Sequence, residues 1–279
     1  MKLQSNAKIN LTLDITGKTE NGYHLIDSVF QSISLFDEIE IEKSDTLSVS
    51  FSDKTVAAEK SIAKKTAEAF FEYAGISGGA DIYIRNNIPS CSGMGGGSGD
   101  AAAVLIGLCH MYQANLTIED LIKITAPIGA DIPFCLVGGT ARVTGIGEKI
   151  KPLPFAGEHP VLIIKKGEKQ STAKMYEMLD SVPVQPIKTE QMLSALKSGD
   201  KALFFGSISN AFTAVSDISN AETELKSLGA EAVGLSGSGP TVFGIFADKR
   251  ARDEAFLKFA EKCTCFKAEF SPFGVQILR

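Results

Sequence analysis

Hydrophobic and polar residues alternate strictly along the first segment of the chain. Four aliphatic side chains fall on one face and four polar side chains on the other: Ile9, Leu11, Leu13 and Ile15, against Lys8, Asn10, Thr12 and Asp14. A period of two predicts a β-strand that buries its aliphatic face. The same period places Lys8 and Asn10 side by side, and this spacing alone favours a solvated polar face for them.

The dipeptide Asn21-Gly22 follows this strand and is a strong signal for a hairpin turn. Tyr23 and His24 therefore lie just beyond the turn. On their own they indicate no more than a turn aromatic and a surface histidine.

The rest of the chain mixes the two periods. Strands are expected around residues 39–41, 47–51, 82–84, 161–164, 235–246 and 265–270, the last one closing the chain. Helices are expected over 56–74 and 100–112, after Thr117, from Ser171, from Thr189, over 201–212, up to Gly229 and over 250–262. In the first helix Ile62, Phe70 and Tyr73 should face the core, and Gly75 should end it. This mixed order predicts an α+β fold.

A length of 279 residues suggests two domains. The segment 151–160 contains three prolines and a glycine, which is typical of a domain boundary. We therefore expect an N-terminal domain over residues 1–153 and a C-terminal domain over residues 154–279.

Glycines are concentrated in residues 88–104, Ile-Pro-Ser-Cys-Ser-Gly-Met-Gly-Gly-Gly-Ser-Gly-Asp-Ala-Ala-Ala-Val, which lead into the helix expected from Asp100. The start of a helix has free N–H groups and a partial positive charge, and glycines let an anion approach the backbone closely. Gly93, Gly95, Gly96, Gly97 and Ser98 are thus predicted to cradle a polyphosphate.

Two better-known glycine motifs do not fit this loop. A P-loop ends in Gly-Lys-Ser/Thr, and no lysine occurs between Pro89 and Ile122. In a dinucleotide fingerprint an acid should follow at the end of a strand, whereas Glu119 and Asp120 lie in an expected helix. A flexible surface loop is the remaining alternative, but such loops seldom run directly into an Ala-rich helix.

A single acid, Asp131, stands in the otherwise apolar stretch Gly129-Ala-Asp-Ile-Pro-Phe. Pro133 should stop this stretch from continuing as a regular helix. An isolated carboxylate is costly unless it is paired or catalytic. Local sequence favours equally a second interpretation, in which Asp131 caps the segment at Ile132.

The composition is that of an ordinary soluble protein, with 44% hydrophobic and 22% charged residues. A net charge of −5 argues against nucleic acid or an anionic membrane as the main partner. The longest apolar run, residues 101–111, is too short to cross a bilayer. The first residues lack a signal or transit pattern. Together these two observations favour a cytoplasmic location. Five cysteines without a C-x-x-C pair are expected to be reduced thiols.

Several motifs occur together in one order: Ala7-Lys-Ile-Asn-Leu11, Gly22-Tyr-His24, the loop 89–103, Gly129-Ala-Asp-Ile-Pro133 and Leu235-Ser-Gly-Ser-Gly-Pro-Thr-Val-Phe243. This set resembles the GHMP small-molecule kinases over nearly the full chain. The resemblance implies a ribosomal-S5-like N-terminal domain, a ferredoxin-like C-terminal domain and an active site in the cleft between them. It also implies ATP with Mg²⁺, and phosphorylation of the 2-hydroxyl of 4-diphosphocytidyl-2-C-methyl-D-erythritol in non-mevalonate isoprenoid biosynthesis.

The resemblance carries roles to particular residues. Lys8 and Asp131 take the positions of the catalytic pair. The ATP-phosphate loop corresponds to Pro89, Ser92, Gly93, Met94, Gly95, Gly96, Gly97, Ser98 and Gly99, with Ser98 as the hydroxyl nearest the metal. Tyr23 and Tyr176 match aromatics that stack on the two faces of cytosine, and His24 matches a residue that hydrogen-bonds it. Asn10, Phe30 and Thr172 correspond to further positions that contact the substrate.

Two positions depart from the family pattern. Gly99 replaces a serine and removes one hydroxyl from the loop, and Lys60 stands where an asparagine is expected to touch adenine.

Two other functions therefore stay open: a kinase of this fold acting on another alcohol, of the homoserine or mevalonate type, and a non-catalytic nucleotide-binding module. A monomer or a homodimer is expected, and His110 and His159 are interpreted as structural.

Overall fold

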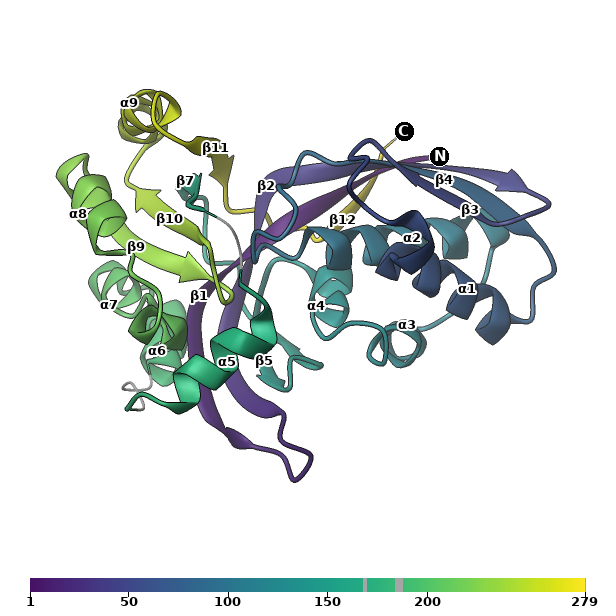
Figure 1. Cartoon of the computed structure of the whole chain (residues 1–279), viewed down its shortest axis with the longest axis horizontal. Helices are drawn as coiled ribbons and strands as arrows, with labels where there is room; N and C mark the ends of the chain where they lie inside the picture. The colour runs from purple at the N-terminus through teal and green to yellow at the C-terminus, as the bar shows by residue number, and fades with distance from the viewer. Residues whose placement is uncertain (168–169, 184–187, 279) are drawn as a thin grey trace.

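The computed structural model describes residues 1–167, 170–183 and 188–278 (Figure 1). The strands are β1 (Lys2–Lys18), β2 (His24–Ser44), β3 (Ser48–Phe51), β4 (Gly79–Arg85), β5 (Thr140–Gly145), β6 (Lys149–Pro152), β7 (Pro160–Lys165), β8 (Ser209–Asn210), β9 (Ala230–Ser236), β10 (Thr241–Phe246), β11 (Thr264–Glu269) and β12 (Val275–Leu278). The helices are α1 (Ile62–Ala74), α2 (Gly96–Tyr112), α3 (Ile118–Thr125), α4 (Ile132–Val137), α5 (Thr172–Asp180), α6 (Thr189–Ser198), α7 (Lys201–Gly206), α8 (Ser219–Ser227) and α9 (Lys249–Ala260), with 3₁₀ turns η1 (Ala58–Lys60) and η2 (Ala211–Ala214). This confirms the predicted α+β class.

A long hairpin of β1 and β2 organises the larger sheet. The strand order is β12-β1-β2-β4-β3, with β5 and β6 extending from β2 and β8 pairing with β1. The predicted turn at Asn21-Gly22 is confirmed: Gly22 has φ +82° and donates its N–H to the Thr19 carbonyl at 2.9 Å. Helices α1–α4 lie on one face of this sheet (Figure 1).

The smaller sheet has the order β11-β7-β10-β9, and every pair in it is antiparallel. One face packs against α8 and α9 through residues such as Leu225, Phe246 and Phe259. Its other face shares a core with the β1–β2 hairpin, where Ile9 and Phe243 belong to the same buried cluster. The two sheets are therefore joined by a continuous apolar core.

Both faces of β1 are covered, which corrects the solvated polar face expected for Lys8 and Asn10. Their exposed fractions are 3% and 1%. The alternating pattern placed the polar residues correctly on one face, but that face turns toward α2 and α4 instead of toward water. A local pattern cannot reveal this, because the covering elements come from distant parts of the chain.

The starts of two helices differ from the prediction. Helix α1 begins at Ile62 instead of residue 56, because Ser61 caps it by accepting from the Lys64 N–H. Phe70 is buried and Gly75 ends the helix as expected, whereas Tyr73 is 48% exposed and faces outward. Helix α2 begins at Gly96 instead of Asp100, so Gly96, Gly97 and Gly99 belong to its first turn, while Gly93 and Gly95 precede it.

Other differences concern the second half. The helix expected over 201–212 ends at Gly206, because the following residues form β8 beside β1. The strand expected at 265–270 does not close the chain: β12 follows and pairs with β1. The division at residues 153 and 154 stays a prediction, since the chain changes sheet between β6 and β7 but returns to the larger sheet at its end.

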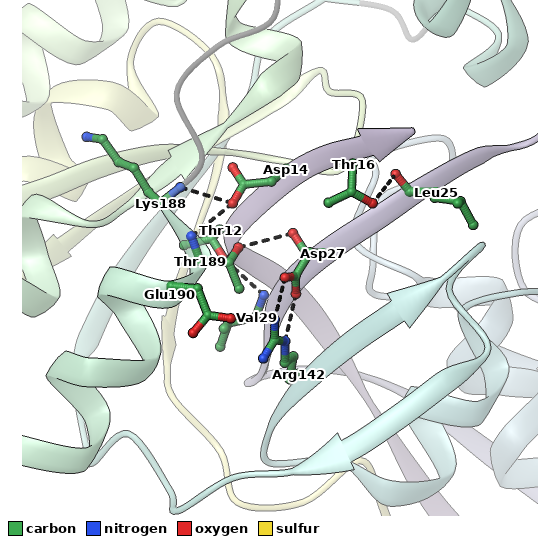
Figure 2. Close-up of polar contacts among 10 residues, drawn as sticks. All are labelled: Thr12, Asp14, Thr16, Leu25, Asp27, Val29, Arg142, Lys188, Thr189 and Glu190. Atoms are coloured by element: carbon green, nitrogen blue, oxygen red, sulfur yellow. Dashed lines mark hydrogen bonds and ion pairs between the residues drawn. The ribbon is translucent and has the colours of Figure 1, made fainter. Parts of the chain in front are cut away.

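Helix α6 is anchored to the hairpin at its first residues (Figure 2). Asp14 accepts the backbone N–H groups of Lys188 and Thr189 at 3.0 and 2.9 Å. It thereby satisfies donors at a helix start that lacks a side-chain cap of its own. Thr189 also donates to the Asp27 carbonyl, and Asp27 binds Arg142 of β5 through two hydrogen bonds. A buried polar junction therefore fixes α6 on the larger sheet.

Candidate active site

A cavity of about 420 Å³ opens beside the glycine loop. The start of α1, the loop before α2 and the first turn of α2 line it, and Asp131 lies at its edge. Seven of the predicted loop residues line the cavity: Pro89, Ser92, Gly93, Gly95, Gly96, Gly97 and Ser98. Its size is within the range of small-ligand sites.

The backbone of the loop requires glycine at two positions. Gly93 and Gly95 have φ +77° and +73°, where other residues are strained. A Cβ atom on Gly93 would lie 2.6 Å from the Ser236 carbonyl oxygen, and one on Gly95 would lie 3.1 Å from Cγ of Lys8. The loop is therefore pressed between β1 and the turn after β9. The first N–H groups of a helix have no partner within it, and the first turn of α2 lines this cavity, so these groups are placed to bind an anion there.

Lys8 and Asp131 meet next to this loop, as the resemblance implied. Lys8 Nζ lies 3.6 Å from Asp131 Oδ2, and the Lys8 N–H donates to the Met94 carbonyl at 2.9 Å. Asp131 occupies the N-cap position of α4, as the capping interpretation expected, but its side chain makes no capping hydrogen bond there. Pro133 lies in the first turn of α4, where proline is tolerated, and so it begins a short helix instead of preventing one.

The ammonium group of Lys8 is held by two buried neighbours. Asn10 Oδ1 accepts from Nζ at 3.0 Å, and the Phe30 ring centroid lies 4.5 Å from it. Asn10 Oδ1 also accepts the N–H of Gly237 at 2.7 Å, while its amide donates to Ser28. Because these bonds occupy both ends of the amide, Asn10 orients Lys8 in this structure.

The motif Leu235–Phe243 joins the site from the smaller sheet. Ser236 Oγ donates to the Gly93 carbonyl at 3.1 Å. Asn210 donates to the carbonyls of Leu235 and Gly237 at 2.8 Å each, which fixes the turn that bonds Asn10. Sequence reasoning missed Asn210, because nothing in its local sequence distinguishes it from an ordinary turn asparagine.

A buried pair of acids underlies the loop, and sequence reasoning assigned it no role. Asp37 accepts the N–H groups of Asn87 and Ile88 at 2.5 and 2.7 Å. Burial raises the pKa of Asp37, and burial together with the Asp37 charge raises the pKa of Asp100 well above its usual range. Oδ1 of Asp100 has no hydrogen-bond partner among the described residues. The two acids line the cavity and hold one charge more readily than two.

The residues predicted to bind the base lie at the tip of the hairpin and on α5. Tyr23 is 63% exposed, and Thr172 is also exposed. The His24 ring stacks on Tyr176, with centroids 4.3 Å apart and an interplanar angle of 17°. Burial, with a contribution from the charge of Asp131, raises the pKa of Tyr176 to about 12. Tyr176 therefore lies within the electrostatic reach of the Asp131 carboxylate.

Three positions do not join the cavity. Met94 is fully buried in the core, and Gly99 faces β1, where an added Cβ would lie 2.3 Å from Ser5 Oγ. A serine at position 99 would therefore meet Ser5 and not the ligand, so this departure costs no contact to phosphate. Lys60 is exposed and lies outside the lining, whereas Ser61 and Ile62 belong to it.

The other two histidines have structural surroundings. His110 is exposed on α2, and His159 packs among Phe204, Phe205 and Phe270.

Within residues 1–167, 170–183 and 188–278, no cluster of three or more His, Cys, Asp or Glu could hold a metal ion. Every helix in this described part is too short or too polar to span a membrane.

Known proteins resemble this chain in both halves. The family description "GHMP kinases N terminal domain" matches residues 61–139, and "GHMP kinases C terminal" matches residues 192–265. A 4-diphosphocytidyl-2-C-methyl-D-erythritol kinase of Caldicellulosiruptor bescii is 38% identical and covers 96% of each chain. A crystal structure of 4-(cytidine 5'-diphospho)-2C-methyl-D-erythritol kinase has a TM-score of 0.79 and 29% identity, covering 97% of this chain and 99% of that one. Homoserine kinase of Cytophaga hutchinsonii shares the fold, with a TM-score of 0.80, 17% identity and coverage of 100% and 97%.

Proposed function

Since the chain belongs to the GHMP kinases, and within them to the 4-diphosphocytidyl-2-C-methyl-D-erythritol kinase family, we propose that it phosphorylates the 2-hydroxyl of that substrate with ATP. The supporting observation is the approach of Lys8 to Asp131 at 3.6 Å beside the glycine loop. A carboxylate at the cavity, an amine next to that carboxylate and a helix start that lines the cavity are the parts that phosphoryl transfer to an alcohol needs.

Asp131 orients the acceptor hydroxyl and takes its proton. A carboxylate is a far weaker base than an alkoxide, so it accepts the proton late, as the bond to phosphorus forms. Lys8 then stabilises the negative charge of the transferring group and of Asp131. Because the transition state is loose, alignment and charge stabilisation account for most of the catalysis.

The N–H groups of Gly96, Gly97 and Ser98 at the start of α2 bind the phosphates of ATP. Mg²⁺ is part of this proposal, and the oxygen atoms beside the cavity suit it: the Ser98 hydroxyl and the unpartnered Asp100 Oδ1 are both oxygen donors. When bound, the metal neutralises phosphate charge. Cytoplasmic location and a monomeric or homodimeric state also stay predictions.

The cytidine end lies between the hairpin tip and α5. Aromatic side chains grip a pyrimidine by stacking, and a histidine at its edge supplies selection. The exposed ring of Tyr23 is available for such stacking, whereas the stacked His24 ring already covers one face of Tyr176.

An assay of ADP release with a panel of alcohols tests the proposal. We expect turnover with 4-diphosphocytidyl-2-C-methyl-D-erythritol and at least a hundredfold lower kcat/KM with homoserine or mevalonate, which lack the base. Preferred turnover of homoserine or mevalonate would assign the chain to another alcohol, since the fold is shared with those kinases. Binding of ATP without turnover of any alcohol would indicate a non-catalytic module.

A further inference from the structure

Helix α5 holds the His24 ring with two side chains. Tyr176 and Asp180 are four residues apart, so they lie on the same face of the helix. Tyr176 stacks on the imidazole, and Asp180 Oδ1 lies 2.8 Å from its Nε2 atom. The side chain of His24 is only 10% exposed in this position. One contact fixes the plane of the ring, and the other fixes its rotation within that plane.

Lys18 keeps Asp180 charged. Lys18 and His24 are paired directly across β1 and β2, and Lys18 Nζ lies 2.6 Å from Asp180 Oδ2. Hydrogen bonds from Lys18 and then from His24 lower the pKa of Asp180. An ionised carboxylate can only accept hydrogen bonds.

The hydrogen of the uncharged imidazole is therefore on Nε2, which leaves Nδ1 as an acceptor. Within the described part of the chain, no residue hydrogen-bonds Nδ1 of His24. A hydrogen bond to an imidazole nitrogen lies in the ring plane, so a base in that plane meets Nδ1 edge-on.

We propose that Asp180 is a positioning residue that sets the preference for cytosine by holding His24 with its acceptor nitrogen toward the base. The proposal rests on the function proposed above. Cytosine carries an exocyclic amine that donates to Nδ1. Uracil has a carbonyl oxygen at the same place, so that two acceptors would face each other. A site that is built for one hydrogen-bonding pattern rejects a base with the opposite pattern.

Substitution of Asp180 separates this role from a structural one. In Asp180→Ala the ring is free to exchange its hydrogen between the two nitrogens. In Asp180→Asn the size is kept, but the amide can also donate to Nε2 and move the hydrogen to Nδ1. Glu177→Ala is the matched control, because Glu177 is an exposed acid on the same helix.

Kinetics are measured at pH 8 with ATP, the cytidine substrate and its uridine counterpart. For both Asp180 variants we expect the KM for the cytidine substrate to rise roughly tenfold and the cytidine-to-uridine preference to fall roughly tenfold. The values of kcat and KM for ATP should stay within about twofold, as should all values for Glu177→Ala. An unchanged base preference in both Asp180 variants would overturn the proposal.

Nitrogen-15 NMR of the imidazole rings gives an independent reading, since the chain has only three histidines. The wild type should show hydrogen on Nε2 of His24, and Asp180→Ala should show a mixture; hydrogen on Nδ1 in the wild type would contradict the proposal. If the wild type phosphorylates no nucleotide substrate, the proposed function fails. Calorimetric binding of CDP and UDP then still decides on Asp180, because equal affinities in the wild type would overturn its role.

Discussion

The phosphate end and the base end of the proposed substrate site are constructed in opposite ways. At the phosphate end, Lys8 is buried and fixed by Asn10 and Asp131, and the positive-φ glycine loop packs between the Lys8 side chain and the backbone of Ser236. At the base end, Tyr23 is exposed on a hairpin tip, and His24 is held by side chains of a single helix. The phosphate end therefore depends on backbone geometry, and the base end depends on side-chain chemistry.

This difference separates chemistry from recognition. Phosphoryl transfer requires alignment of the reacting groups, which buried and repeatedly bonded groups provide. Recognition of a base needs a few contacts that form and break with each turnover. Substitutions at the first end should therefore reduce kcat or stability, and substitutions at the second should mainly raise KM for one substrate.

Asp131→Asn should show the largest effect. The amide keeps the shape but cannot take the proton, so we expect kcat to fall on the order of a hundred- to ten-thousandfold, while ATP still binds. Steady-state kinetics and calorimetric ATP binding are the measurements. Lys8→Met sharpens the test: if the two groups act as a pair, the double variant loses far less than the product of the single losses. A near-normal kcat in purified Asp131→Asn would remove this residue from the mechanism.

Gly93→Ala should lower stability and ATP affinity together. The added Cβ would collide with the Ser236 carbonyl at 2.6 Å, and φ is +77°. We expect a loss of roughly 3 kcal/mol in the free energy of unfolding, measured by urea denaturation. Gly199→Ala is the matched control, because Gly199 has φ +71° and nothing within 4 Å of its Cβ position, so it should lose only about 1 kcal/mol. Equal losses would show that the close packing on Ser236 is unimportant.

Tyr23→Ala tests the base end. Loss of a stacking surface should raise KM for the cytidine substrate about tenfold and leave KM for ATP unchanged. Steady-state kinetics with each substrate varied in turn measure this. Tyr83→Ala, at another partly exposed tyrosine, should leave both values unchanged. A similar rise for ATP and for the cytidine substrate would contradict the separation of the two ends.

Asp100→Asn should change stability less than Gly93→Ala does, and that change should depend on pH. The folded protein holds the pKa of Asp100 above its ordinary value, so the folded state binds more protons than the unfolded chain. The stability contributed by this group is fully present below its unfolded pKa and is lost as pH rises through the folded pKa. The amide does not titrate, and so the variant should gain stability relative to the wild type as pH increases.

Urea denaturation at several pH values between 4 and 8 measures this difference. A wild type that gains stability over the variant as pH rises would show that the folded protein favours the ionised carboxylate. Such a result would mean that the folded protein does not disfavour a negative charge on both Asp37 and Asp100.

Periodicity and turn residues were sufficient for most of the elements. The alternation in β1, the turn at Asn21-Gly22 and the capping of α3 by Thr117 are local features, and the structure confirms them. Helix starts were less predictable: Ser61 begins α1, and Gly96 begins α2, because capping and tertiary packing decide among several possible starts.

For the candidate site as well, local features were predictable and contacts between distant residues were not. A glycine-rich run before an Ala-rich stretch was enough to predict a glycine loop that leads into a helix, since the physics of a helix start is local; phosphate binding by this loop stays a prediction. The neighbours of each side chain were not predictable. The hydrogen bonds of Asn10 to Lys8 and Gly237 could not be foreseen, and Asp37, Asp180 and Asn210 gave no local signal.

The sequence by itself determined the α+β class, the hairpin and a helix start suited to phosphate, because backbone preferences and side-chain periods act over a few residues. Only the tertiary structure decided that Lys8 is buried, that it meets Asp131 and that α5 holds His24. These contacts join residues more than a hundred positions apart. They arise because two sheets bury a shared core, and which polar groups then face each other depends on how the whole chain packs.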